Sequence, residues 1–358
     1  VGGEERVVGA RVRDALTGSE RDVRARVVVN ATGPWAERLL EASGLRSEKH
    51  VLPSQGIHLL FRAVRLPLAS ATHIKAPSGR EGLAMRRGPY VYVGTSDVRY
   101  DGPLESPVAD GAAIEDVLRM SVGCFPGLEL TADDIVGTWA GVRPLVAEPG
   151  KSPRDTPRKD VIWRTRPGIL TIAGGKLTTY RRMGQRILDR VAEELGRALP
   201  GEERSAEVPL PGAPSDGRDI EAWRAGLLED LRARGVAAAA AERIAWLYGA
   251  EAHALLRYIE EDGGWGEPLG AATPALRGEV RLAVEQGMGL TLEDVLDRRM
   301  ALLLFSEDQG RQAAPEAAAI LARLLGWSDE TRAAQHAAYA AIAARHGPHG
   351  GAAASPPG

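Results

Sequence analysis

Apolar residues follow two different spacings along the chain. Up to about residue 175 they form short runs bounded by glycine, proline and polar turn residues, a pattern typical of strands. We expect strands at residues 6–13, 23–30, 57–64, 90–95, 135–142, 161–164 and 169–173. The second of these ends in three consecutive valines at 27–29, which indicates a buried strand.

Apolar residues with helical spacing occur in a few short segments of the first half of the chain and through most of the second half. Early helices fit residues 34–44, 112–122 and 177–195. A proline-rich linker begins at about residue 200, and the alanine-rich sequence beyond it predicts helices at 220–234, 237–248, 251–261, 274–286, 292–305, 315–325 and 329–345. Thr291 is expected to cap the helix at 292–305, with Glu293 and Asp294 in its first turn. The order of elements predicts a mixed α/β and α+β fold with an all-α domain at its C-terminal end.

Composition narrows the class of protein. The 358 residues are 44% hydrophobic and 26% charged, which excludes a largely disordered chain. No run approaches the roughly 18 apolar residues of a membrane helix. A single cysteine, Cys124, excludes an internal disulfide framework and suits a reducing compartment. The net charge of −3 provides no global basic field, so we expect no nucleic-acid partner.

Charge is unevenly distributed, and this admits two interpretations. Residues 151–190 carry eleven basic and three acidic side chains, whereas residues 201–300 carry eleven basic and nineteen acidic ones. These segments are either two solvated faces, or the basic segment faces an anionic ligand.

Three short segments are candidates for chemistry. Residues 27–35 end a strand in small residues, which lets backbone approach a bulky ligand, although a plain strand-to-helix turn has the same pattern. Residues 137–145 hold Arg143 beside glycine and proline. This arginine either binds a phosphate or carboxylate, or forms a structural ion pair. Residues 172–181 place two glycines before a helix. The first turn of this helix is either a site for anions or electron-rich atoms, or the start of an ordinary capped helix.

Other motifs of known chemistry are missing from the sequence. The seven histidines are scattered and form no H-E-x-x-H motif, so we expect no metal site. There is no G-x-S-x-G nucleophile elbow and no G-x-G-x-x-G dinucleotide fingerprint. Residues 94–97 end a strand in polar groups, either as a functional rim or as a simple turn.

Taken together, the motifs resemble one family. In order, they lie at residues 31–36, 53–59, 94–98, 134–136, 140–145, 174–181 and 291–299. This set is similar to the FAD-dependent glycerol-3-phosphate dehydrogenases of the bacterial aerobic type, over residues 6 to 340. Members of that family carry the glycine fingerprint in an N-terminal segment with no counterpart here. Together with the absence of methionine at Val1, this suggests a truncated sequence or a fragment.

The resemblance implies a domain plan built around FAD. It consists of part of a Rossmann-like FAD-binding domain, an inserted antiparallel sheet that binds substrate, a return of the FAD-binding domain, a helical C-terminal domain and a disordered tail. The corresponding boundaries are 1–50, 51–165, 166–199, 200–346 and 347–358.

The resemblance also implies roles for individual residues. The flavin would be bound by two strand ends, formed by Ala31, Thr32 and Gly33 and by Gly174, Gly175, Lys176, Leu177 and Thr178. Arg143 and Lys176 would hold the substrate phosphate or its hydroxyls, with Thr95 and Asp97 in the same pocket. His58 is a candidate catalytic base, or a hydrogen-bonded structural residue.

The activity implied is oxidation of sn-glycerol 3-phosphate to dihydroxyacetone phosphate, with electrons passed from FAD to a quinone. The resemblance further implies a cytoplasmic enzyme that forms a homodimer and contacts the inner face of the cytoplasmic membrane as a peripheral protein. Two other hypotheses stay open at this point: a related flavin oxidoreductase acting on an amino or hydroxy acid, and an inactive fragment that lacks the dinucleotide fingerprint.

Overall fold

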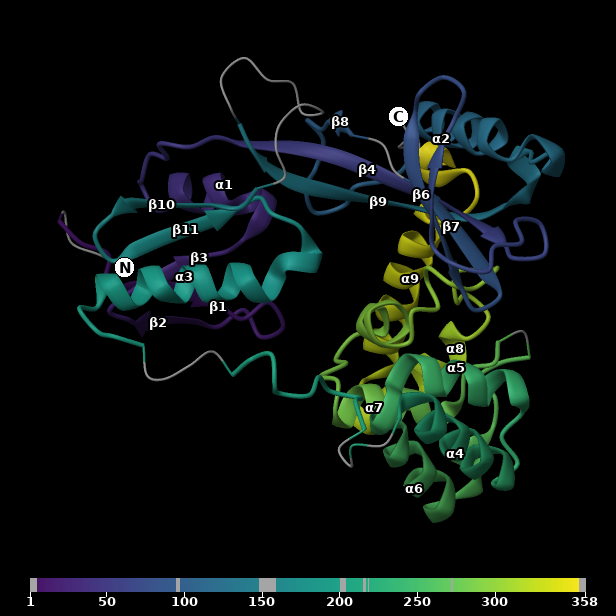
Figure 1. The fold of residues 1–358 in the computed structure, drawn as a ribbon. Coiled ribbons are helices and arrows are strands. Elements are labelled where there is room, and N and C mark those ends of the chain that lie inside the picture. Colours follow the sequence, from purple (N-terminus) through teal and green to yellow (C-terminus); the bar gives the residue numbers. More distant parts are fainter. Residues whose placement is uncertain are drawn as a thin grey trace. The chain divides into compact units, whose positions relative to one another are not determined.

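The computed structural model describes residues 5–94, 97–147, 159–199, 204–214, 217, 219–271 and 273–353 (Figure 1). The chain divides into two compact units. Unit 1 comprises Val1–Gly56, Ser96–Pro107 and Ala140–Ser205, and unit 2 comprises Ile57–Thr95, Val108–Trp139 and Ala206–Gly358. The five-part domain plan stays a prediction.

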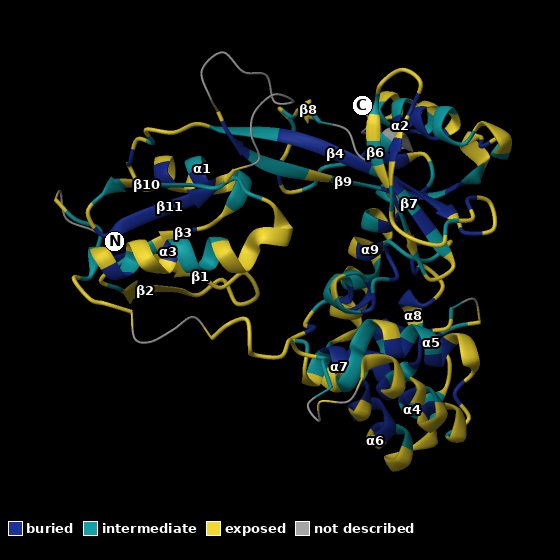
Figure 2. Cartoon of the chain, in the orientation of Figure 1, coloured by how far each residue is buried: buried dark blue, intermediate teal, exposed yellow. Residues whose placement is uncertain are grey.

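Unit 1 contains a small sheet between two helices. Strands β10 (Val161–Arg166), β11 (Ile169–Ala173) and β3 (Val28–Asn30) form the order β10-β11-β3, in which β11 and β3 are parallel. Ile169 packs with Leu40 of α1 (Ala36–Ala42), and Leu170 packs with Ile187 of α3 (Tyr180–Glu194). Because successive strand residues point to opposite faces, the two helices cover opposite faces of β11, which is buried throughout (Figure 2).

The predicted strand at 23–30 is wrong as a single element. The chain forms β2 (Glu20–Arg24), an antiparallel partner of β1 (Gly9–Arg13), and β3 starts only at Val28. The prediction that all three valines are buried is also wrong, since Val29 is 40% exposed. Apolar character alone does not distinguish a strand covered on both faces from one whose alternate residues are uncovered.

A larger sheet combines short and long strands. Its order is β5-β6-β7-β4-β8, and β9 pairs with β4. The bounds are β4 (Val51–Arg62), β5 (Thr72–Lys75), β6 (Glu81–Arg87), β7 (Tyr90–Gly94), β8 (Val98–Arg99) and β9 (Ile135–Val146). Helix α2 (Gly111–Cys124) contacts β5 and β7. Strands β5 and β6 were not predicted, because they are short and lack a sustained apolar run.

The second half of the chain is helical, as predicted. Its helices are α4 (Ile220–Ala233), α5 (Ala238–Tyr248), α6 (His253–Glu261), α7 (Arg277–Glu285), α8 (Ala314–Leu325) and α9 (Asp329–Arg345). The predicted helix at 292–305 is wrong in its second half. A π-helical segment, Asp294–Arg299, ends where Ala301 adopts a left-handed conformation with φ of 53°, which no continuous helix permits.

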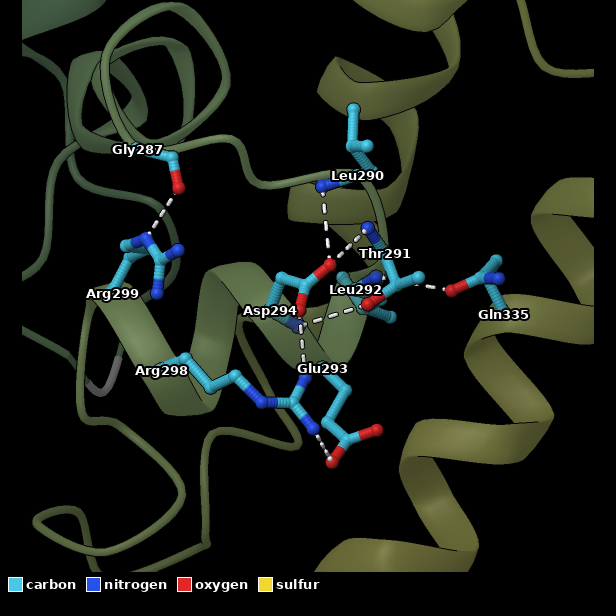
Figure 3. Close-up of polar contacts among 9 residues, drawn as sticks. All are labelled: Gly287, Leu290, Thr291, Leu292, Glu293, Asp294, Arg298, Arg299 and Gln335. Atoms are coloured by element: carbon cyan, nitrogen blue, oxygen red, sulfur yellow. Dashed lines mark hydrogen bonds and ion pairs between the residues drawn. The ribbon is translucent and has the colours of Figure 1, made fainter. Parts of the chain in front are cut away.

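The predicted cap of that segment is confirmed (Figure 3). The backbone N–H of Asp294 donates to Oγ1 of Thr291 at 3.0 Å, and the Asp294 carboxylate accepts from the Thr291 N–H at 3.0 Å. This reciprocal pair is a capping box. The Leu292 N–H donates to Oε1 of Gln335 on α9 at 3.0 Å, which ties the start of the segment to the last long helix.

The predicted disordered tail is wrong at its start. Gly347 accepts a hydrogen bond from Oγ1 of Thr138 at 3.0 Å, and the Gly351 N–H donates to the Ala109 carbonyl at 3.0 Å. These bonds to other parts of unit 2 order residues that composition alone assigned to a tail. Residues 354–358 lie outside the described residues. None of the described helices is long and apolar enough to cross a membrane.

Candidate functional site

Arg143 on β9 lies in a small polar cluster of unit 1. Its Nη1 donates to Oδ1 of Asp97 at 3.0 Å, and the Oγ of Ser54 donates to the same oxygen at 3.0 Å. The Arg143 and Asp97 side chains are 24% and 20% exposed, and Ser54 is buried. The carboxylate therefore fixes a guanidinium group that still reaches solvent, an arrangement that can bind a phosphate or carboxylate.

Gly56 on β4 provides the room for this arginine. A Cβ atom at position 56 would lie 2.3 Å from Nη2 and 2.4 Å from Nη1 of Arg143. Any other residue would displace the guanidinium group. Of the two remaining residues assigned to this pocket, Asp97 is the ion-pair partner of Arg143, and Thr95 lies outside the described residues.

The two predicted flavin-side segments follow neighbouring parallel strands. Asn30 at the end of β3 pairs with Thr171 of β11, so Ala31 and Gly174 leave the sheet at the same edge. The carboxyl edge of parallel strands is where open α/β sheets bind ligands. The structure thus places the segments 31–33 and 174–178 at one edge of the sheet. Before this, only the resemblance had assigned both of them to the flavin.

Asn30 shapes the first of these segments, a role that the sequence reasoning missed. Its side chain is fully buried, donates from Nδ2 to the Ala36 carbonyl at 2.8 Å, and accepts from Oγ1 of Thr32 at 2.7 Å. An asparagine directly after a run of valines is the signal that could have revealed it. The turn that follows has Gly33 at φ of 60°, with open space where its Cβ would be.

The second segment requires two consecutive glycines. Gly174 and Gly175 have φ values of 81° and 83°. A Cβ on Gly174 would lie 2.5 Å from the Lys159 carbonyl oxygen, and one on Gly175 would lie 2.5 Å from the sulfur of Met183. The left-handed backbone conformation of both residues, and the backbone contact at Gly174, therefore favour glycine at these positions.

Lys176, Leu177 and Thr178 form the start of the following helix. The predicted helix at 177–195 begins as one 3-10 turn, Leu177–Thr179, and continues as α3. All three residues are exposed, and Leu177 is 88% exposed. The free N–H groups and exposed side chains of this turn adjoin the glycine pair, where they can contact a planar, electron-rich group.

These observations fit the ring end of FAD. Small residues and positive-φ glycines lie at one strand edge, and open space adjoins Gly33. Two apolar side chains are exposed, Leu177 in the turn after β11 and Val29 on strand β3. Such a surface suits a flat aromatic ring system, which needs close backbone approach and apolar contact.

His58 lies on β4 in unit 2, opposite Gly94 of β7. Its ring is stacked on Trp139, with centroids 5.1 Å apart and planes inclined by 16°, and meets Tyr92 edge-on at 5.8 Å. A Cβ on Gly94 would lie 2.4 Å from Cδ2 of His58, so this glycine makes room for the imidazole. The side chain is half-buried among aromatic rings, a location compatible with either a base or a structural histidine.

No group of three or more potential metal ligands occurs in the part of the chain that the structure describes. Cys124 is half-buried at the end of α2.

Comparison with known proteins identifies two family matches. The profile described as FAD dependent oxidoreductase matches residues 2–181, and the profile described as C-terminal domain of alpha-glycerophosphate oxidase matches residues 203–332. This chain is similar to the crystal structure of the glycerol-3-phosphate dehydrogenase from Bacillus halodurans complexed with FAD. The two sequences are 30% identical, the TM-score is 0.83, and the match covers 96% of this chain and 67% of that one.

Curated relatives agree with this assignment. Aerobic glycerol-3-phosphate dehydrogenase of Bacillus subtilis is 34% identical over 84% of this chain, and that of Staphylococcus haemolyticus is 32% identical over 91%. The alignments cover 55% and 59% of those relatives, so the chain spans little more than half of their length. Because the first profile covers half of the sequence and the site geometry agrees with it, the chain belongs to the FAD dependent oxidoreductase family.

Proposed function

We propose that this chain carries the substrate side and the flavin-ring side of an FAD-dependent glycerol-3-phosphate dehydrogenase. The reaction is oxidation of sn-glycerol 3-phosphate at its C2 hydroxyl to give dihydroxyacetone phosphate. The observation that carries the proposal is the guanidinium group of Arg143, fixed by Asp97 and Gly56 yet partly open to solvent. The names of the relatives support the same substrate.

The residues of this chain supply binding and orientation. The planar guanidinium of Arg143 suits two oxygens of a phosphate, and the exposed ammonium of Lys176 adds a second cation. Holding the phosphate in one place restricts the position of C2, and positioning of this kind contributes several kcal/mol to catalysis, on the order of 7–11 kcal/mol at most. His58 is the candidate acceptor of the C2 hydroxyl proton.

FAD, when bound, supplies the two-electron acceptor. Residues 31–33 and 174–178 would hold its ring end, because they combine close backbone approach with exposed N–H groups. The start of α3 favours negative charge beside it through the helix dipole.

Electron transfer to a quinone, peripheral attachment to the inner face of the cytoplasmic membrane and a cytoplasmic homodimer complete the proposal. They rest on the family resemblance. Some relatives in the family use oxygen as the electron acceptor instead.

Expression of the full-length gene tests the proposed function. The purified protein should show a flavin absorbance spectrum and reduce an artificial dye when glycerol 3-phosphate is added. Arg143→Ala should raise KM strongly, because it removes a charge-assisted anchor. Absence of flavin in the full-length protein, or an unchanged KM, would contradict the proposal.

The same preparation separates the alternatives. A related oxidoreductase would reduce the dye with amino or hydroxy acids and leave glycerol 3-phosphate unused. An inactive remnant would be indicated by a stop codon upstream of Val1 in the genomic DNA, whereas an in-frame G-x-G-x-x-G codon series would support a working enzyme.

A further inference from the structure

The helical C-terminal half contributes an aromatic side chain to the sheet that carries His58. Phe305, in the segment after the π-helix, lies 5.8 Å from Trp139 and 6.1 Å from Tyr92, measured between ring centroids. Both contacts are edge-to-face, with planes inclined by 63° and 64°. The rings of His58, Tyr92, Trp139 and Phe305 thus form one aromatic cluster within unit 2.

Strand register places two rings of this cluster, His58 and Tyr92, on one face of the sheet. Leu60 pairs with Tyr92, and His58 pairs with Gly94, so His58 and Tyr92 project from the same face. Phe61, which has the opposite parity on β4, is fully buried on the other face. The four rings of the aromatic cluster are all half-buried, unlike a closed hydrophobic core.

Contacts of Phe305 and of residues close to it in sequence tie this segment to the sheet. Arg62 on β4 forms a bidentate ion pair with Glu307, with both contacts at 2.6 Å. Nε2 of Gln309 donates to the Val136 carbonyl on β9 at 3.1 Å, and Gln309 is 2% exposed. The guanidinium carbon of Arg87 lies 4.4 Å above the centre of the Phe305 ring, which fixes the ring orientation through a cation–π contact.

We propose that Phe305 is a positioning residue for His58, supplied by the helical C-terminal half and acting through Trp139. This inference rests on the proposed function, in which His58 receives the proton of the substrate hydroxyl. Trp139 has His58 stacked on one side and Phe305 against it at an angle, so the position of the imidazole plane depends on both rings.

The physical effect expected is on rate and not on substrate affinity. A base must lie within hydrogen-bond reach of the proton that it removes, about 2.6–3.2 Å between heavy atoms. A displacement of about 1 Å can cost on the order of 100-fold in rate. Phosphate binding is assigned to Arg143 and Lys176, which Phe305 does not orient, so KM should stay nearly constant.

The test compares variants of the full-length FAD-loaded enzyme in the dye assay. Phe305→Leu, which keeps apolar volume and removes the ring, should lower kcat by about 10- to 100-fold and change KM by less than about twofold. Phe305→Tyr should restore kcat to near the wild-type value. Phe125→Leu is the matched control. Phe125 is also half-buried in unit 2, but it follows α2 and is not one of the four rings of the aromatic cluster. This variant should leave kcat unchanged.

A second measurement does not depend on activity. The imidazole protons of His58, assigned by their loss in His58→Gln, should be displaced in the NMR spectrum by the ring current of Trp139. Phe305→Leu should move these resonances, and Phe125→Leu should not. If Phe305→Leu does not fold, Phe305→Met offers a similar volume without a ring.

The outcomes separate the two proposals. Wild-type enzyme without activity toward glycerol 3-phosphate contradicts the proposed function, and the NMR comparison then still tests the placement of His58. In an active enzyme, an unchanged kcat in Phe305→Leu, or a kcat that Phe305→Tyr does not restore, overturns the positioning role. So does an unmoved His58 resonance.

Discussion

The guanidinium group of Arg143 occupies the space beside Gly56 in which any other side chain would begin. A Cβ atom there would come within 2.3 Å of Nη2, far inside van der Waals contact. The ion pair with Asp97 also holds the guanidinium at this place. The position of Arg143, which is proposed to bind the substrate phosphate, therefore depends on Gly56, a residue without a side chain on the neighbouring strand.

Replacing Gly56 should weaken substrate binding. Gly56→Ala displaces the guanidinium group and removes charge-assisted bonds that contribute about 1.5–3 kcal/mol each. We expect KM for glycerol 3-phosphate to rise about tenfold or more, since about 1.4 kcal/mol corresponds to a factor of ten. Steady-state dye reduction measures it.

The matched control is Gly111→Ala at the start of α2, where a Cβ meets nothing within 4 Å. It should leave KM and kcat unchanged. A Gly56→Ala enzyme with the wild-type KM would show that the guanidinium of Arg143 does not bind the substrate from this position.

Replacing Gly174 should reduce flavin content. Gly174→Ala places a methyl group 2.5 Å from the Lys159 carbonyl oxygen in a left-handed backbone conformation, so the turn before α3 must move. We expect a lower ratio of flavin absorbance to protein absorbance in the purified full-length protein. Gly196→Ala is the control, because Gly196 also has a positive φ, 61°, but open space around it.

Both glycine variants carry a similar backbone penalty, of about 1–2 kcal/mol. Both should therefore lower the melting temperature, and only Gly174→Ala should lose flavin. Equal flavin content in the two proteins would rule out a role for the residue 174 turn in holding the cofactor.

Much of this arrangement could be predicted from local sequence. The glycine pair before Lys176, the small residues after β3 and the cap at Thr291 all depend on neighbours within about four positions, and local patterns report such neighbours well. The structure places the two glycine-containing segments at one sheet edge because their strands are parallel neighbours.

Other features depend on contacts between distant positions. Asp97 and Arg143 were both candidates, but no spacing rule predicts that they pair across 46 positions of sequence. Asp97 also accepts from Ser54, which lies within the motif at 53–59 but had been assigned no role. The aromatic cluster joins His58 and Phe305 only through the packing of sheet and helical half, which the one-dimensional pattern does not contain.

A buried ion pair should dominate the stability of the helical half. Glu279 on α7 is fully buried and accepts hydrogen bonds from Arg243 on α5 and from the hydroxyl of Tyr248, the latter at 2.7 Å. Burial alone would lower the pKa of Arg243, but the carboxylate of Glu279 raises it above its ordinary value. The guanidinium therefore stays charged inside the protein.

Glu279→Gln leaves that charge without its counterion. We expect a loss of about 3–5 kcal/mol in the free energy of unfolding, measured by denaturant titration. Glu316→Gln, which breaks a partly exposed pair with Arg277, is the control and should cost less than about 1 kcal/mol. Similar losses in the two variants would contradict a special role for the buried pair.

The stability of the folded protein should depend on pH below 4 through Asp134, the residue directly before β9. Its carboxylate accepts from Nε of Arg65 at 2.5 Å and from the Thr131 N–H at 2.9 Å. The hydrogen bond from Arg65 is the main cause that lowers the pKa of Asp134 from 3.8 to about 2. Below pH 4 the unfolded chain binds this proton before the folded one does, so the stabilisation present above pH 4 is lost as the pH falls through about 2.

Asp134→Asn should therefore be less stable than the wild type at pH 6, with a difference in melting temperature that narrows steadily from pH 4 to pH 2.5. The neutral amide cannot pair with Arg65, and below pH 4 the wild-type carboxyl increasingly resembles it. Asp133→Asn changes the exposed neighbour and should show no such convergence with the wild type. A difference for Asp134→Asn that stays constant down to pH 2.5 would show that the Arg65 contact does not hold the carboxylate in solution.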